Sequence, residues 1–374
     1  MSLQTLDTPA LLLDADKLER NCRRMRERLH AHGVILRPHV KTAKSVDVTQ
    51  RALDAPAGPI TVSTLREAEY FFDHGFRDIL YAVGIVPGKV RRIAELTRRG
   101  ARITTIVDSV EAARALAAAA AEAKVRVPAL IEIDSDGHRA GVVPADEARL
   151  TEIGAALGES LQGVMTHAGD SYNCESTEAI AQVAERERSA VVSCAKVLRS
   201  HGHVAPVVSV GSTPTATFAR SFEGVSEVRT GVYVFHDLVM AGLGVCAVED
   251  IAISVLASVI GHQRDRNWII TDAGWMAMSR DRGTAKQRVD QGYGVVCDLA
   301  GRPIDDLIVA DTNQEHGIIA DRNGKPVDIA RFPVGTLLRI LPNHACATAA
   351  QHPHYNVIAG EPVVEAVWPR FSGW

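Results

Sequence analysis

Hydrophobic and polar positions follow two different rhythms along the chain, and the first rhythm covers its N-terminal two-thirds. Short runs rich in β-branched residues recur there, separated by longer amphipathic stretches. Eight runs are expected as strands: Val34–Val40, Ile60–Ser63, Ile79–Val83, Ile103–Val107, Ala129–Ile133, Leu161–Thr166, Pro206–Val210 and Val225–Val234. Strands that alternate with helices form parallel sheets, so this pattern predicts an α/β fold, a (β/α)8 TIM barrel over residues 15–241.

The stretches between these runs carry helical end signals. After Ser63, Thr64 precedes Glu67 by three residues, which is the spacing of a capping box, and Gly75 stands where a helix would end. The alanine-rich segment 112–123 is expected to be a packed helix and not a flexible linker. Each strand except the last is therefore expected to lead into a helix.

The second rhythm begins after Ala241, where apolar runs follow one another with little helical pattern between them. Glycine, aspartate, asparagine and proline turns separate these runs. Strands are expected within residues 251–262, 267–275, 293–301, 307–320, 336–348 and 363–371. Residues 242–374 are thus predicted to form a mainly antiparallel β domain, and the sequence leaves open whether residues 1–14 join it.

Composition narrows the class of protein. The 374 residues are 46% hydrophobic and 23% charged, which is ordinary for a globular protein, and the net charge of −4 favours neither nucleic acid nor an anionic membrane as a partner. The sequence shows no membrane-spanning stretch and no signal-peptide pattern at its start. Its six scattered cysteines form no paired framework. We therefore expect a cytoplasmic enzyme.

Polar residues with catalytic chemistry follow several predicted strands, and in a barrel such strand ends meet at one rim. They are His39 and Lys41 after the first strand, Asp134, His138 and Arg139 after the fifth, His167 and Tyr172 after the sixth, and Gly211, Ser212 and Thr213 after the seventh. Singly, each is better explained as a turn or a core residue. Together, a lysine, a glycine-hydroxyl loop and an aromatic pair suggest pyridoxal phosphate held by the lysine as a Schiff base.

The sequence "RPHVKTAK" offers two lysines for that role, Lys41 and Lys44. A lysine attacks an aldehyde only after losing its proton, so it needs desolvation or cationic neighbours. Lys41 closes the first predicted strand, where burial would lower its pKa. Lys44 is expected to enter a helix and face solvent. We therefore favour Lys41.

A second group of chemical interest is "LPNHACAT" near the C-terminus. If this segment is a strand, His344 and Cys346 project from the same face. An imidazole and a thiolate suit zinc better than harder divalent ions. Two side chains are too few for a closed structural site, so water or substrate would complete the shell. Taken alone, the pair is better explained by a packed cysteine beside a surface histidine.

Seven motifs together resemble the D-serine dehydratase and D-threonine aldolase family, a metal-dependent branch of the alanine-racemase-like pyridoxal phosphate enzymes. They are "LRPHVKTAK", "THAGDSY", "VSVGSTPT", "EVRTGVYVFHD", "DAGWMAMSRDRG", "NQEHG" and "LPNHACAT". The resemblance covers nearly the whole chain. It implies the barrel followed by the β domain, two chains per functional unit, and pyridoxal 5'-phosphate with a divalent metal as cofactors.

The resemblance also implies roles for single residues. Lys41 would carry the cofactor, with Tyr172 at the pyridine nitrogen and His167 beside the ring. The phosphate would lie among Gly211, Ser212, Thr213, Gly231 and Val232. His344 and Cys346 would hold the metal, which is zinc by preference, with manganese, cobalt or magnesium as alternatives.

The activity implied is that of a dehydratase, an ammonia-lyase that converts D-serine or D-threo-3-hydroxyaspartate to a 2-oxo acid and ammonia. Aldolases of the family usually carry aspartate at the position of Cys346, so the cysteine favours dehydration over retro-aldol cleavage to glycine. A racemase would leave the His344–Cys346 pair without a task, and a non-catalytic carrier of the cofactor would be a single barrel. Arg139, Arg280 and Arg282 are candidates to bind a second substrate carboxylate.

Overall fold

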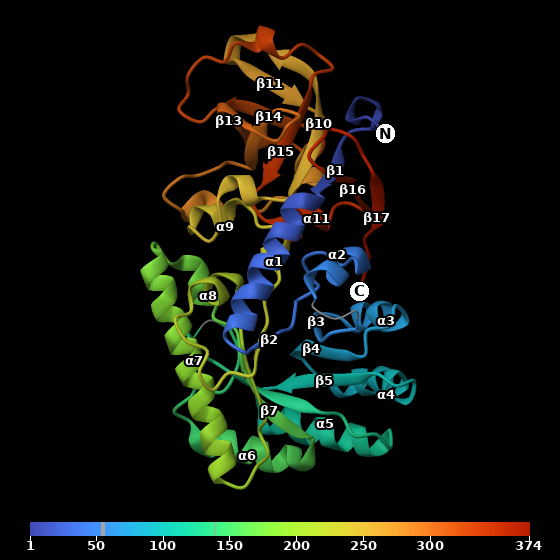
Figure 1. The fold of residues 1–374 in the computed structure, drawn as a ribbon, viewed down its shortest axis with the longest axis vertical. Helices are drawn as coiled ribbons and strands as arrows, with labels where there is room; N and C mark the ends of the chain where they lie inside the picture. Colours follow the sequence, from blue (N-terminus) through green and yellow to red (C-terminus); the bar gives the residue numbers. More distant parts are fainter. Residues whose placement is uncertain (54–56, 138) are drawn as a thin grey trace. The chain divides into compact units, whose positions relative to one another are not determined.

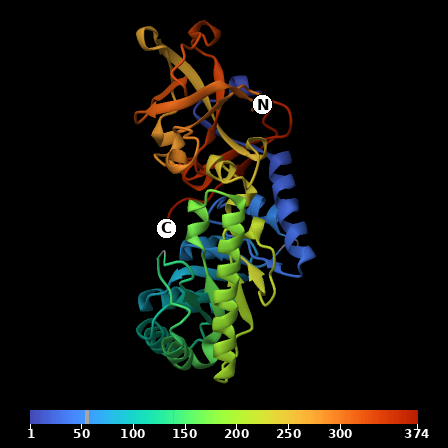
Figure 2. The same cartoon turned by 90° about the vertical axis from the view of Figure 1, so that its left-hand side faces the viewer.

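A computed structural model describes residues 1–53, 57–137 and 139–374 of the chain (Figures 1 and 2). The chain forms two compact units. The barrel unit comprises Arg24–Gly231 with Gly373–Trp374, and the β unit comprises Met1–Arg23 with Val232–Ser372. The chain thus changes unit inside α1 (Ala15–Ala31) and again after Gly231, whereas the sequence pattern placed these boundaries after residues 14 and 241.

The barrel unit is built on eight parallel strands in the order β2-β9-β8-β7-β6-β5-β4-β3. They are β2 (Ile35–Leu36), β3 (Ile60–Val62), β4 (Asp78–Gly84), β5 (Arg102–Val107), β6 (Ala129–Ile133), β7 (Leu161–Thr166), β8 (Val207–Val210) and β9 (Glu227–Val228). The chain after β2 closes the sheet against β3, because Thr61 donates to the Pro38 carbonyl at 2.8 Å and accepts from the Val40 amide at 2.9 Å. The predicted (β/α)8 barrel is confirmed.

The first and last predicted strands are much shorter than expected. β2 ends at Leu36, and residues 37–40 keep only separate strand-like hydrogen bonds, such as those from the Arg37 amide to Val228 at 2.9 Å and from the His39 amide to Thr230 at 2.8 Å. After β9 the chain leaves the sheet, and Val232–Val234 forms a 3₁₀ turn. The polar residues expected at strand ends therefore lie on irregular backbone.

Helices follow the strands as predicted. They are α2 (Val46–Ala52), α3 (Leu65–Asp73), α4 (Val90–Arg98), α5 (Val110–Glu122), α6 (Glu147–Leu157), α7 (Thr177–Ser200) and α8 (Thr213–Phe218). The Thr64 side chain accepts from the Glu67 amide at 3.0 Å, as the capping pattern predicted, but the Glu67 carboxylate accepts from the Ser63 amide instead of closing the box. The long helix α7, yellow-green in Figures 1 and 2, packs against β7 and β8.

The β unit contains nine strands in the order β11-β14-β13-β12-β15-β10-β1-β16-β17. They are β1 (Ala10–Asp14), β10 (Ile253–Gln263), β11 (Trp268–Thr271), β12 (Gly294–Cys297), β13 (Pro303–Thr312), β14 (Gly317–Asp321), β15 (Leu337–Pro342), β16 (His354–Ile358) and β17 (Ala366–Pro369). Three short helices accompany them: α9 (Leu238–Gly242), α10 (Trp275–Met278) and α11 (Ala345–Ala349). Because β11 also pairs with β10, six of the strands close on themselves. The sequence pattern missed β16.

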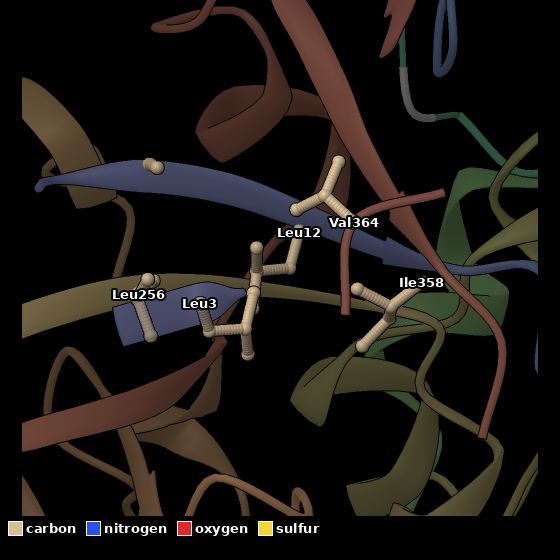
Figure 3. Packing of buried hydrophobic residues seen from close by; sticks show 6 residues of the cluster. Leu3, Leu12, Leu256, Ile358 and Val364 are labelled. Atoms are coloured by element: carbon tan, nitrogen blue, oxygen red, sulfur yellow. The ribbon is translucent and has the colours of Figure 1, made fainter. Parts of the chain in front are cut away.

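The N-terminal strand belongs to the β unit. β1 pairs antiparallel with β10 and parallel with β16, and all five of its residues are buried. Figure 3 shows Leu3 and Leu12 gathered with Leu256, Ile358 and Val364, a cluster of apolar side chains from both ends of the chain. Burying such side chains removes apolar surface from water, which is the main stabilising contribution to a fold of this kind. Residues 1–14 therefore complete the β unit's core.

Candidate functional site

The barrel unit brings most of the predicted site residues to one place. Lys41 follows β2, His167 and Tyr172 follow β7, Gly211–Thr213 follow β8 and Gly231 follows β9. β2, β9, β8 and β7 are consecutive neighbours in the sheet, and all four run in the same direction. The carboxyl ends of neighbouring parallel strands lie along one edge, so these residues line a continuous arc of the rim.

Lys41 lies in the turn that follows the seam with β3, and its side chain is exposed. The burial that the sequence suggested is absent, because the turn carries Lys41 beyond the last strand-like hydrogen bond, at Val40. Its ammonium nevertheless lies close to two imidazoles. Burial lowers the pKa of His39 well below its ordinary value, and the charge of Lys41 lowers it further. Lys41 therefore projects from the rim beside neutral side chains.

Lys44 has a different environment from the one expected. It does not enter a helix, since its φ is +46° and α2 begins only at Val46. Its side chain is 13% exposed and its Nζ lies 3.0 Å from Oε1 of Glu67, whose side chain is fully buried. Because its amine contacts the Glu67 carboxylate and its side chain is mostly buried, Lys44 is an ion-pair partner and is less accessible to an aldehyde than the exposed Lys41.

His167 is held in one orientation by the loop after β8. Its Nδ1 donates to the carbonyl of Gly211 at 2.7 Å. Burial lowers the pKa of His167 to about 4, although the bond to Gly211 opposes this, and the charge of Lys41 adds to the lowering. The imidazole is therefore neutral near pH 7. The ring of Tyr172 lies 6.4 Å from it, tilted by 44°, and Tyr172 is about one-third exposed at 36%.

The loops after β8 and β9 form a polar cradle in which two positions, Gly211 and Gly231, have no room for a side chain. A Cβ on Gly211, where φ is +146°, would lie 1.9 Å from the Arg229 carbonyl, and one on Gly231 would lie 2.9 Å from that of His39. Buried hydroxyls line the same segments. Ser212 Oγ lies 2.9 Å from Ser171 Oγ, and Thr213 Oγ1 lies 2.5 Å from Thr230 Oγ1.

Glycine backbone and several hydroxyls at two neighbouring strand ends are the chemistry that receives a phosphate dianion. The residues present thus fit a phosphorylated cofactor, with a lysine and a neutral imidazole on the same arc of the rim. Val232, the remaining predicted contact, is the first residue of the β unit that follows Gly231.

Two buried charged residues close to these loops, Arg229 and Glu187, were not identified from the sequence. Arg229 is 4% exposed and donates to Ser209 Oγ at 2.9 Å and to the Thr166 carbonyl. Glu187, on α7, is 2% exposed and accepts the amides of Ala168 and Gly211. The sequence carried a signal for both. Arg229 is a charged residue within a predicted buried strand. Glu187 occupies one position of an otherwise apolar helical stripe, which consists of Ile180, Ala184, Glu187, Val191 and Cys194.

The three arginines proposed for a second carboxylate all lie beside other groups. Arg139 donates to Glu132 at 3.1 Å, Arg282 lies 2.5 Å from Asp290, and the Arg280 guanidinium lies 5.2 Å from the Trp275 ring. Asp134 caps its own loop by accepting the Gly137 amide at 2.7 Å. His138 lies outside the described residues.

In the β unit, His344 and Cys346 do not lie on a strand. β15 ends at Pro342, His344 is the N-cap of α11 and Cys346 lies in the first turn of that helix. The alternation expected of a strand is therefore wrong, because Asn343 turns the chain out of the sheet. The two side chains still meet, since the Cys346 side chain hydrogen-bonds to His344.

Asp281, which the sequence analysis did not single out, supports this pair. Its Oδ2 lies 2.6 Å from Nδ1 of His344. Burial lowers the pKa of His344, but the bonds to Asp281 and Cys346 outweigh it and raise the pKa to about 11. A carboxylate that hydrogen-bonds to one imidazole nitrogen is the arrangement commonly found behind metal-binding histidines. The nitrogen and sulfur donors fit a divalent ion that prefers such ligands.

A buried carboxylate also fixes the helix that carries the pair. Asp237 accepts the Ala345 amide at 2.9 Å through one oxygen and the Met240 amide at 2.9 Å through the other. Burial raises the pKa of Asp237, and the charge of His344 opposes that shift. The start of α11 is thus tied to the start of α9.

A parallel eight-stranded barrel with a lysine-bearing rim, followed by a closed antiparallel unit, defines an alanine-racemase-like protein. Residues 13–238 match the family model for the alanine racemase N-terminal domain, and residues 252–358 match a putative serine dehydratase domain. The chain belongs to the alanine-racemase-like family that includes D-threo-3-hydroxyaspartate dehydratase and D-serine dehydratase. Pyridoxal phosphate is the cofactor that this family implies.

Its relatives match along their full length. D-threo-3-hydroxyaspartate dehydratase from Delftia sp. is 55% identical, with 100% of this chain and 99% of that protein covered. D-serine dehydratase from Dictyostelium discoideum is 32% identical, with 95% and 94% covered. The solved structure of the Delftia enzyme covers both chains completely with a TM-score of 0.97, and a cysteine variant of it is described as being in the metal-free form. D-threonine aldolases are more distant relatives.

The pKa of His167 makes the stability of the cofactor-free protein depend on pH. Because its pKa is about 4 in the folded chain and near 6.5 in an unfolded one, the unfolded state takes up a proton first as the pH falls. Stability should therefore be lost between pH 6.5 and about pH 4, by roughly 3 kcal/mol at about 1.4 kcal/mol per pKa unit. Urea unfolding at several pH values measures this loss.

His167→Asn is the matched control, because its amide can still donate to the Gly211 carbonyl but does not titrate. It should lose less stability than the wild type over the same pH range. An NMR titration of His167 with a midpoint near 6.5 would contradict the lowered pKa of this buried imidazole.

Proposed function

We propose that the chain is a dehydratase, an ammonia-lyase that uses pyridoxal phosphate and a divalent metal. Its substrate would be a D-3-hydroxy amino acid, D-threo-3-hydroxyaspartate or D-serine, and its products a 2-oxo acid and ammonia. The observation that carries this proposal is the arc of the barrel rim on which an exposed lysine, a neutral imidazole and a glycine-backed cradle of hydroxyls lie together. The relatives supply the choice of reaction.

Within the barrel unit, each residue has a task in this proposal. Ser212, Thr213 and the glycine backbone bind the cofactor's phosphate, and Lys41 carries the cofactor. Bound pyridoxal phosphate stabilises negative charge at the substrate's α-carbon. With the cofactor bound, the Lys41 amine would be placed to remove the substrate's α-proton, which requires an uncharged lysine.

The aromatic residues of the rim orient the cofactor ring. A neutral His167, fixed by its bond to the Gly211 carbonyl, would contact the bound ring without adding a positive charge. Tyr172 would meet the pyridine nitrogen with its phenol, which would hold that nitrogen less positive than a carboxylate partner would. The ring would then be a moderate electron acceptor, suited to a reaction in which a β-hydroxyl leaves.

In the β unit, His344 and Cys346 bind the metal, and Asp281 orients the imidazole. Zinc is the ion that this nitrogen and sulfur pair favours, ahead of manganese, cobalt or magnesium. The bound ion supplies a Lewis acid for the departing β-hydroxyl. Since two side chains leave most of its coordination positions to water or substrate, the ion serves catalysis more than folding.

The aldolase alternative keeps the same cofactors and breaks a different bond. It would cleave a D-3-hydroxy amino acid to glycine and an aldehyde. Cys346 stands where the resemblance places an aspartate in aldolases, and the aldolases are the more distant relatives. Both observations favour the dehydratase.

We further propose that the enzyme works in the cytoplasm as a homodimer. Within the described residues no disulfide joins any of the six cysteines, which fits a reducing compartment. Light scattering at micromolar concentration should give twice the mass of one chain. A mass equal to one chain would contradict the dimer.

The cofactor should be attached to Lys41 and not to Lys44. Lys41→Arg should abolish the visible absorption of bound pyridoxal phosphate, because a guanidinium cannot form the covalent bond. Lys44→Arg should retain it, because arginine keeps the ion pair with Glu67. Borohydride reduction followed by peptide mass spectrometry locates the attachment directly, and a label on Lys44 would refute the assignment.

The reaction and the metal are tested together with a panel of D-threo-3-hydroxyaspartate, D-serine and D-threonine. The first two should give 2-oxo acid and ammonia, with their L enantiomers as inactive controls. Chelation should lower the rate by about two orders of magnitude or more, because a Lewis acid contributes several kcal/mol to such a step. The cofactor's absorption should persist. Glycine as the main product would favour the aldolase, and an undiminished rate without metal would refute the Lewis-acid role.

Cys346→Ala should reproduce the effect of chelation, since one remaining imidazole binds the ion poorly. Cys346→Asp offers a harder oxygen ligand, so readdition of metal should now favour manganese or magnesium over zinc.

A further inference from the structure

A buried carboxylate of the barrel unit has no task in the mechanism above. Glu187 lies near the middle of α7 and is only 2% exposed. Burial raises the pKa of its carboxyl, and hydrogen bonds oppose that shift. A buried carboxyl is costly unless its oxygens are hydrogen-bonded, so the contacts of Glu187 indicate why it is there.

Those contacts join two segments of the proposed cofactor site. A single carboxyl oxygen, Oε1, accepts the Ala168 amide at 3.2 Å and the Gly211 amide at 2.9 Å. Ala168 follows His167, which is the residue proposed to face the ring. Gly211 precedes Ser212, which begins the phosphate cradle. Glu187 thus bonds to the backbone beside both groups of cofactor contacts.

Glu187 contacts the two segments just beyond the point where β7 and β8 stop pairing. The register between β7 and β8 runs from Gly163 with Val207 to Met165 with Ser209. Ala168 and Gly211 lie beyond that last pair, so ladder hydrogen bonds do not fix them to one another. The bond from His167 to the Gly211 carbonyl and the contact between Ser171 Oγ and Ser212 Oγ join the two segments, and Glu187 accepts the two backbone amides beside the His167 bond.

A third contact extends the connection into the cradle. The Thr215 hydroxyl acts on the Glu187 carboxyl, where it opposes the rise in pKa that burial causes. That hydroxyl accepts the Ser212 amide at 3.1 Å and lies 3.0 Å from Ser212 Oγ. Movement of Glu187 would therefore change the orientation of the Ser212 hydroxyl as well as the path of the Gly211 backbone.

We propose that Glu187 is a positioning residue that holds the ring-facing segment at His167 and the phosphate-facing segment at Gly211–Ser212 in fixed register. This inference rests on the proposed pyridoxal phosphate site. Without the carboxyl, two buried amides lose their acceptor, and the two segments keep the His167–Gly211 bond and the side-chain contact between Ser171 and Ser212 but lose their link through the backbone amides. Cofactor affinity then falls because the protein must order both segments when the cofactor binds.

Glu187→Met tests the proposal, because methionine has a similar size and offers no strong acceptor. Glu187→Gln is the rescue variant, since its amide oxygen can accept both backbone amides and its NH2 can reach Thr215. Val191→Ala is the control: Val191 is fully buried one turn along α7, so this change weakens the helix without removing the carboxyl.

The first measurement is amide hydrogen exchange in the cofactor-free proteins. In Glu187→Met, the amides of Ala168 and Gly211 should exchange about tenfold faster or more relative to Glu187→Gln. The second measurement is the dissociation constant for pyridoxal phosphate, obtained by absorbance titration. It should rise about tenfold or more in Glu187→Met and stay within about threefold of wild type in the other two variants.

The proposal is wrong if Glu187→Met leaves both quantities within about twofold of wild type, or if Val191→Ala changes them as much. If Glu187→Met does not fold, Glu187→Gln decides, and a loss of cofactor affinity beyond about threefold in that variant overturns the proposal. Wild-type protein that binds no pyridoxal phosphate would refute the proposed function, while hydrogen exchange would still decide whether Glu187 fixes the two segments.

Discussion

Closure of the eight-stranded sheet at Pro38–Val40 is the constraint on which the proposed site depends. This short segment bonds to β3 through Thr61 on one side and to the chain after β9 through Thr230 on the other. Lys41 is the next residue, so the seam of the barrel fixes the start of the turn that carries it. On the other side of the seam, β2, β9, β8 and β7 are consecutive neighbours in the sheet, and their ends supply the lysine, the cradle and the imidazole. A sheet left open at this seam would hold the Lys41 turn on one side only.

Neutral and charged groups are separated sharply around this seam. His39 and His167 stay neutral because burial and nearby cations disfavour protonation, which lowers the pKa of each. Lys44, three residues from Lys41, forms an ion pair with the buried carboxylate of Glu67. The neighbours of the two lysines in this short motif thus suit them to different roles: Lys44 is an ion-pair partner and Lys41 is available to a cofactor. The exposure of Lys41 leaves its amine accessible to a cofactor that binds at the rim.

In the β unit, too, carboxylates position the candidate functional side chains, although the elements that carry them are different. The side chains of His344 and Cys346 meet at the start of a five-residue helix, and Asp237 and Asp281 fix that helix start and the imidazole. In both units, buried carboxylates accept backbone amides or hold a cationic side chain beside the candidate functional residues. Such groups are costly to bury, and each is compensated by hydrogen bonds that also define geometry. The positions of the functional side chains are therefore set by residues that need not take part in the chemistry.

The sequence by itself determined the barrel, the β unit and the cluster of residues at the strand ends, because hydrophobic period and the directions of parallel strands are properties of local pattern. The tertiary structure alone decided that Lys44 is paired and Lys41 exposed, since Glu67 approaches from a separate helix. The tertiary structure also shows a helix start at His344 where the apolar run had predicted a strand, because the chain turns out of the sheet at Asn343. Arg229, Glu187 and Asp281 gained their importance in the same way. Their partners lie far away in the sequence, and only folding brings each charged side chain to the groups that compensate it.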